Sequence, residues 1–281
     1  MASLSRYRAE GGVTLLADTC AAGGVTFAFT ERAGGVSQAP YTGLNLGDRC
    51  GDDPSAVAEN RRRALAAIGA SECAPRLVSP HQVHGDNVVV VREATGADHA
   101  RAVYEAREGA DAVVCCAPDV PVLLCFADCV PVVICAPGGF AVVHSGWRGT
   151  IARIAQKAAG VLVSETGCSP SDLSAYVGPC IGGVDYEVSA QLIRDFIREF
   201  GEGVCVGVPE RRKLNLSYAV ACALTDAGVT RDNLAIAGVS TATATDRFYS
   251  YRAENGACGR HAAIAVMSTK PAPAWELIET A

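Results

Sequence analysis

Two histidines and one cysteine stand beside turn residues at points where apolar runs end. They are His84 in QVHG, Cys129 in ADC and His144 in VHSGWRG. Imidazole nitrogen and thiolate sulfur are good ligands for Zn²⁺. Long stretches of chain separate the three, unlike the short paired spacings of structural zinc modules. Three protein ligands leave a fourth position open for water or substrate, so this set predicts a catalytic metal site.

Two further residues lie close to these ligands in the sequence. Asp128 directly precedes Cys129, and its carboxylate would hold a histidine N–H behind the metal. His81 lies just ahead of His84 and is an alternative ligand.

Four helices are expected to position these residues. Asp53-Pro54 is typical of a helix N-terminus, and the apolar face that follows ends at Gly69. Apolar residues at helical spacing predict further helices over 149–167, 189–200 and 216–228.

Short apolar runs between the helices predict strands. Pro137-Gly138-Gly139 between two of these runs predicts a hairpin. Strands and helices do not alternate strictly, which favours mixed sheets with helices packed on them, an α+β arrangement. We find no linker or repeat and expect a single domain over residues 1–281. The predicted strands are 25–29, 88–91, 112–116, 122–126, 132–135, 140–143, 204–208 and 234–238.

Composition narrows the class of protein. Hydrophobic residues make up 49% of the chain and charged residues 19%, which is typical of a globular fold. The formal net charge of −6, with no basic patch, argues against nucleic-acid binding. The apolar runs are too interrupted for a secretion signal or a membrane span, so we expect a cytoplasmic location. The thirteen cysteines are dispersed without a C-x-x-C pair, which is typical of reduced thiols.

Five strings together resemble the YfiH-like family, also called laccase-domain or polyphenol-oxidase-like proteins. In chain order they are QVHGDNV, ADCVPVVI, VVHSGWRGT, GPCIGGVDYEV and FYSYRAENGACGR, and the resemblance spans roughly residues 25–268. It implies a metal site made of His84, Cys129 and His144. It also implies a layered α/β/β/α fold, with mixed sheets sandwiched between helices.

The resemblance further implies a zinc-dependent purine nucleoside phosphorylase with adenosine deaminase activity. Its substrates would be phosphate and the nucleosides adenosine, inosine, guanosine and methylthioadenosine. In deamination, a metal-activated water would attack C6 of the purine. In phosphorolysis, Arg148 and the N–H groups of the helix expected from residue 149 would hold the phosphate. An ordinary surface salt bridge is the alternative role for Arg148.

Four more residues are candidate substrate contacts, and each has a structural alternative. Gln82 would orient the substrate or pair with backbone, and Asn45 in LNLG would contact it or shape a turn. Cys180 in GPCIGG is placed near the site by the resemblance, or is a buried thiol. Arg252 in FYSYR would bind an anionic group or cap a strand.

Other functions compete with this hypothesis. A metal-free cysteine hydrolase or amidase would use Cys129 as nucleophile and a histidine as base, and some relatives are linked to editing of peptidoglycan precursors. A non-enzymatic protein would use the same three ligands, plus a fourth, as a structural metal site. A multicopper oxidase needs many histidines, often in His-x-His pairs, whereas this chain has five and no such pair. Copper at the three ligands would therefore be adventitious.

Overall fold

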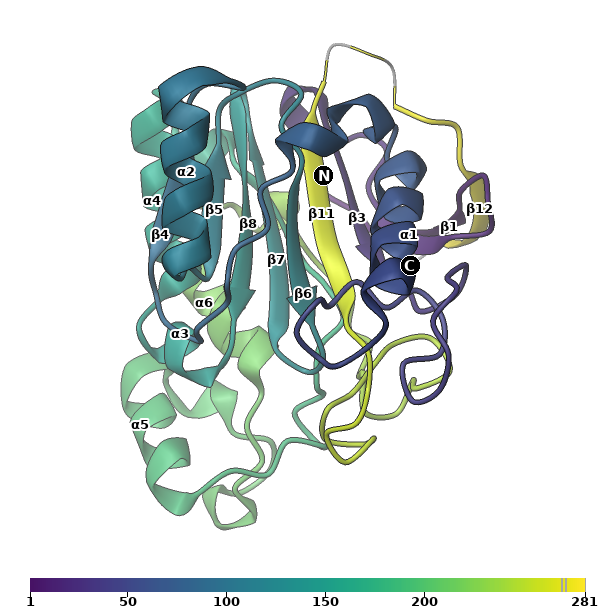
Figure 1. The fold of residues 1–281 in the computed structure, drawn as a ribbon. Helices are drawn as coiled ribbons and strands as arrows, with labels where there is room; N and C mark the ends of the chain where they lie inside the picture. Colours follow the sequence, from purple (N-terminus) through teal and green to yellow (C-terminus); the bar gives the residue numbers. More distant parts are fainter. Residues whose placement is uncertain (269, 271, 281) are drawn as a thin grey trace.

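Two six-stranded sheets face each other in this chain, whose computed structural model describes residues 1–268, 270 and 272–280 (Figure 1). In spatial order the first sheet contains β12 (Glu276–Thr280), β1 (Ser5–Arg8), β2 (Thr14–Ala17), β3 (Val25–Thr30), β11 (His261–Met267) and β6 (Val122–Phe126). The second contains β10 (Leu234–Ile236), β9 (Ser174–Val177), β7 (Val130–Ala136), β8 (Gly139–Ser145), β5 (Ala112–Cys115) and β4 (Val88–Val91). Neighbouring strands of the first sheet are antiparallel, whereas the second is mixed, because β9–β10 and β4–β5 are parallel pairs.

Helices pack against both sheets. They are α1 (Pro54–Ala67), α2 (Gly96–Glu108), α3 (Trp147–Ile151), α4 (Ile154–Thr166), α5 (Ala190–Phe200) and α6 (Leu216–Asp226). Buried residues of α1 pack on the first sheet, and those of α4 and α6 pack on the outer face of the second (Figure 1). This order of layers confirms the predicted α/β/β/α arrangement.

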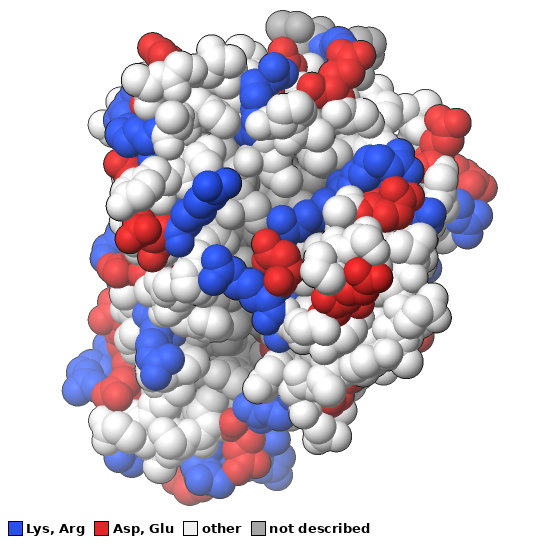
Figure 2. Space-filling model, viewed as in Figure 1, with Lys and Arg blue, Asp and Glu red and all other residues white. Residues whose placement is uncertain are grey.

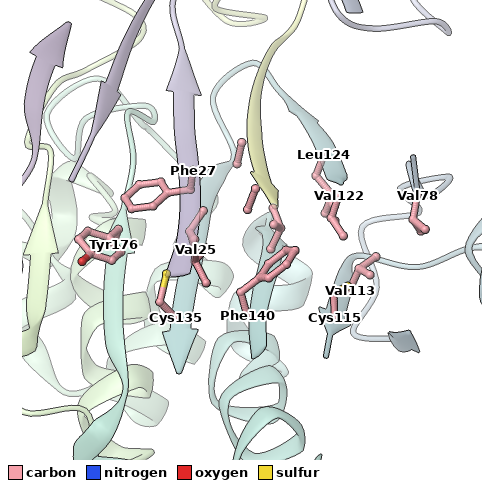
Figure 3. Close-up of a cluster of buried hydrophobic side chains, with 14 of the residues drawn as sticks. Val25, Phe27, Val78, Val113, Cys115, Val122, Leu124, Cys135, Phe140 and Tyr176 are labelled. Carbon is pink, nitrogen blue, oxygen red and sulfur yellow. The ribbon is translucent and has the colours of Figure 1, made fainter. Parts of the chain in front are cut away.

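Large side chains from both sheets meet in the space between them (Figure 3). Phe27 of β3 lies with its ring centroid 4.5 Å from that of Tyr176 on β9. Phe140 of β8 is also fully buried in this layer. The two sheets bury much of their inner faces against each other, so both share one core.

Most predicted elements are present, with three instructive differences. The helix expected from residue 149 begins at Trp147 and is broken before α4, where Arg153 has a left-handed φ of 58°. Helix α2 was not predicted, because its buried positions are alanines that give only a weak apolar periodicity. The strand expected at 204–208 is wrong: only Cys205 forms an isolated bridge there, to Leu214.

The chain crosses between the sheets at one end of the sandwich. Strand β6 belongs to the first sheet and β7 to the second, and residues 127–129 connect them. Strand β8 ends and β4 begins at this same end, since β8 runs antiparallel to β7 and to β5. No helix in the described part of the chain is long and apolar enough to span a membrane.

Phe27→Ala tests the shared core between the sheets. Phe27 is fully buried, and removing its ring is expected to lower the free energy of unfolding by roughly 3–5 kcal/mol. Urea unfolding followed by circular dichroism measures this change. Tyr104→Ala on α2 is the control, because that side chain is 64% exposed and its loss should matter little. Equal effects of the two substitutions would contradict a core that depends on contact between the sheets.

Candidate metal centre

The three predicted ligands, His84, Cys129 and His144, lie together at the end of the sandwich where the chain crosses. We call them the trio. Their ligand atoms all lie within 4.8 Å of one another. The two imidazole rings are nearly perpendicular, at 86°, with centroids 4.9 Å apart. Residues separated by long stretches of sequence thus form one group with the chemistry of a zinc site.

Each ligand comes from a different part of the fold. His84 lies in the turn ahead of β4, Cys129 in the connection between β6 and β7, and His144 near the end of β8. His84 is exposed, Cys129 is half-buried and His144 is buried. The trio is therefore buried on the His144 side and open to solvent at His84.

Asp111, directly before β5, holds two of the ligands in place. Its Oδ1 accepts a hydrogen bond of 2.7 Å from His144 Nδ1 and one of 3.0 Å from the His84 backbone N–H. Its Oδ2 accepts from the backbone N–H groups of Val83 at 3.2 Å and Gly85 at 2.7 Å. Because His144 Nδ1 donates to the carboxylate, the lone pair of Nε2 is free for a metal.

The expectation that Asp128 performs this task is wrong. Its carboxylate accepts hydrogen bonds from the Thr241 hydroxyl at 2.8 Å, the Ser250 hydroxyl at 2.7 Å and the Arg252 backbone N–H at 2.7 Å. The backbone of Asp128 has φ of +87°, which turns the chain sharply just before Cys129. Asp128 therefore ties the Cys129 connection to the loop that precedes β11, and acts on the trio through that connection.

Gly146 lies directly against the trio. A Cβ atom at this position would be 3.1 Å from His84 Cδ2 and 3.2 Å from Cys129 Sγ. Its φ of −73° is open to any residue, so the constraint at Gly146 is space and not backbone conformation. The missing side chain leaves room for the three ligands to converge.

In the metal-free form, charge interactions among the trio and Asp111 set the pKa values of these groups. Burial by itself raises the pKa of Cys129, but the His144 and His84 rings lower it to about 6. Burial by itself lowers the pKa of His144, but the Cys129 thiolate and the Asp111 carboxylate raise it to about 9. Burial likewise opposes ionisation of Asp111, yet its bonds to His144 and to backbone N–H groups leave its pKa below the ordinary value. The metal-free site is thus a thiolate–imidazolium pair near neutral pH, and the thiolate form is the one that binds metal.

Two predicted substrate contacts have structural roles. The Gln82 amide pairs with the backbone of Cys125, donating to its carbonyl at 2.7 Å and accepting from its N–H at 2.8 Å. Asn45 is fully buried; its Oδ1 accepts from the Arg260 N–H at 2.8 Å and its Nδ2 donates to Asp52 at 2.8 Å. Both amides are occupied by the protein itself.

Cys180 lies near Cys129, and the backbone N–H of Arg252 donates to the carboxylate of Asp128, the residue before Cys129. Burial raises the pKa of the Cys180 thiol to about 12, and the charge of nearby Cys129 adds to this. The Arg252 guanidinium lies 5.3 Å from the ring centroid of Tyr186. Tyr186 was not singled out from the sequence. Burial raises the pKa of Tyr186, and the charge of Cys129 adds to this effect.

Arg148 is exposed within the short helix α3, two residues after Gly146. Its guanidinium lies 4.5 Å from the ring centroid of Trp147. His81 is outside the group of metal-competent residues. Its backbone instead bonds to helix α2 and the residues that follow it, with its N–H donating to Ala106 and its carbonyl accepting from Ala110.

Comparisons with known proteins establish the family of this chain. The family model described as "Multi-copper polyphenol oxidoreductase laccase" matches residues 26–268. The chain belongs to that family. A Deinococcus radiodurans protein named purine nucleoside phosphorylase is 41% identical to this family member over 242 residues, or 85% of this chain and 88% of the relative.

Two solved structures have the same fold. The Bacillus licheniformis hypothetical protein YfiH has a TM-score of 0.77 at 27% identity, covering 86% of this chain and 92% of its own. YlmD from Geobacillus stearothermophilus has a TM-score of 0.76 at 28% identity, covering 87% and 92%. The predicted YfiH-like relationship is thereby confirmed.

The lowered pKa of Cys129 predicts an unusual alkylation profile for the metal-free family member. Its thiolate is present above a pKa of about 6 instead of the ordinary 9.0, so reaction with iodoacetamide should rise to half its maximum near pH 6. Rates measured across pH, with peptide mass spectrometry to locate the label, test this. Cys129→Ala should lose the low-pH phase. Its persistence in that variant would assign the phase to another of the thirteen cysteines.

Asp111→Asn tests the carboxylate that supports the ligands. An amide in its place loses the charge and turns an N–H₂ group toward backbone donors, so metal affinity should fall about 10- to 100-fold. Competition with a chromophoric chelator measures the affinity. Asp86→Asn is the matched control, because Asp86 is exposed near His84 and pairs with Lys157. Unchanged affinity in Asp111→Asn would show that the two histidines are positioned without it.

Proposed function

We propose that this protein is a zinc-dependent purine nucleoside phosphorylase that also deaminates adenosine. Its substrates are phosphate and the nucleosides adenosine, inosine, guanosine and methylthioadenosine. The convergence of His84, Cys129 and His144 within 4.8 Å carries the proposal, because it is a donor set for zinc that opens to solvent. The Deinococcus radiodurans relative, which bears the phosphorylase name, supports the choice of reaction.

The residues of the site fit a zinc ion. Two imidazole nitrogens and one thiolate match its ligand preference, Asp111 orients His144, and Gly146 leaves space beside them. Zinc held by these three residues would supply Lewis acidity. No fourth His, Cys, Asp or Glu joins the group in the described residues, which favours a catalytic over a closed structural site. A single three-ligand group also favours zinc over the several coppers of an oxidase relay.

Side chains around the trio would hold the substrate. In phosphorolysis a phosphate oxygen bonds to the anomeric carbon while the bond from that carbon to the purine nitrogen breaks, so an anion must lie beside the sugar. The exposed Arg148 guanidinium, close to Gly146 in the chain, would neutralise that anion. Tyr186 with Arg252 over its ring offers a flat surface for the purine.

A cysteine hydrolase or amidase is the second candidate, and the lowered pKa of Cys129 favours it. In that reaction Cys129 would attack an acyl carbon and a histidine would carry the proton. The metal requirement separates the two candidates, since a thiolate nucleophile keeps its activity after chelation. Either reaction needs Cys129 reduced, and we propose the reducing cytoplasm as its location.

Cys129→Ala should remove both metal and turnover. Wild-type protein is expected to carry about one zinc, to form inosine from adenosine, and to form adenine once phosphate is added. Metal analysis and chromatography of the products measure these outcomes. The variant should lose both activities, because a methyl group cannot bind zinc.

Cys222→Ala is the matched control for this experiment. Cys222 is half-buried on helix α6, so the same chemical change there should leave metal content and turnover intact. A metal-free wild-type protein that leaves adenosine unchanged would contradict the proposal. Activity that survives chelation and fails with iodoacetamide would favour the hydrolase.

A further inference from the structure

A cavity of about 370 Å³ lies between helices α2 and α1. Figure 2 shows charged side chains around a hollow in the middle of this face. Its walls come from residues 48–49, from α1, from the segment 77–81 and from the last turns of α2. None of the trio lines it. A volume of this size suits a small organic ligand better than a single ion.

Three arginines, Arg49, Arg61 and Arg107, line this cavity, which we call the arginine pocket. Arg61 is held in place, since its Nε donates to the Leu46 carbonyl at 2.9 Å and its Nη2 lies 3.3 Å from Asp48. Arg49 and Arg107 form no ion pair with any residue that the structure describes. The pocket therefore holds about two positive charges without a partner, because Asp48 offsets only that of Arg61.

The rest of the wall divides into a polar and an apolar part. His81 also lines the pocket and belongs to its polar part. The apolar part consists of the half-buried Leu77 and Val103 and the buried Val78 and Pro80. A ligand that uses both needs an anionic end and an apolar end.

We propose that the arginine pocket binds a phosphomonoester of a small organic molecule. A phosphoryl dianion matches the two uncompensated charges, whereas a carboxylate would leave one of them unbalanced. Guanidinium groups bind phosphate oxygens in a bidentate manner, and the apolar wall takes the organic part. This site does not depend on the reaction at the trio, so the purine chemistry proposed above can fail without affecting it.

Calorimetric titration of the zinc-loaded protein with phenyl phosphate and with inorganic phosphate tests this proposal. Phenyl phosphate should bind more tightly, because only it reaches the apolar wall. Arg49→Gln and Arg107→Gln should each weaken it about tenfold or more, as expected for loss of a charge-assisted hydrogen bond. Both side chains are exposed, so the variants should fold, which thermal melting checks.

Arg194→Gln is the matched control, because it removes the same charge from an exposed position on helix α5. It should leave binding unchanged, and so should Cys129→Ala at the trio. Failure of phenyl phosphate to bind would overturn the proposal, as would equal weakening by Arg194→Gln or loss of binding in Cys129→Ala. Equal affinities for the two probes would refute the role of the apolar wall.

Discussion

The buried carboxylate of Asp111 is the constraint on which the metal centre depends. It is fully buried and accepts hydrogen bonds from three backbone N–H groups of the His84 turn and from the His144 ring. Its own carbonyl accepts the His144 backbone N–H at 2.7 Å. One residue thus ties two ligands through side chain and main chain. Burying a carboxylate costs free energy unless hydrogen-bond donors surround it. The His84 turn supplies those donors, and the Asp111 carboxylate in return holds the turn in its conformation.

The sandwich architecture explains why a third ligand arrives at the same point. A chain that passes from one sheet to the other must turn at the end of the sandwich, and Cys129 lies in that turn. Asp128 then binds the turn to the loop before β11 through Thr241, Ser250 and Arg252. His84 and Asp128 both have a left-handed backbone, which costs on the order of 1 kcal/mol each. Hydrogen bonds to the two aspartates offset this strain and orient the ligands.

Local sequence signals pointed to the metal ligands, whereas the order of the layers was inferred from the family resemblance. The trio could be inferred because zinc ligands have restricted chemistry and because five motifs resemble one family. Asp111 was missed although a lone carboxylate at the start of the apolar strand β5 is itself a signal, since such a group must have buried partners. The roles of Gln82 and Asn45 could not be read from sequence, because an amide bonds equally well to substrate or backbone. Helix α2 was missed because its buried face consists of alanines, which differ too little in hydrophobicity from the exposed residues to show a helical period.

The uneven burial of the trio limits the side from which a substrate can approach. His144, Asp111 and the strands behind them are buried, so the trio opens to solvent at His84. At that opening the absence of a side chain on Gly146 leaves space beside His84 and Cys129. The buried half of the site, His144 with Asp111, fixes the protonation of the ligands and their geometry. The exposed half, at His84, lies in a turn. Substitutions in the exposed half can therefore alter access to the trio without disturbing the ligand geometry that Asp111 supports.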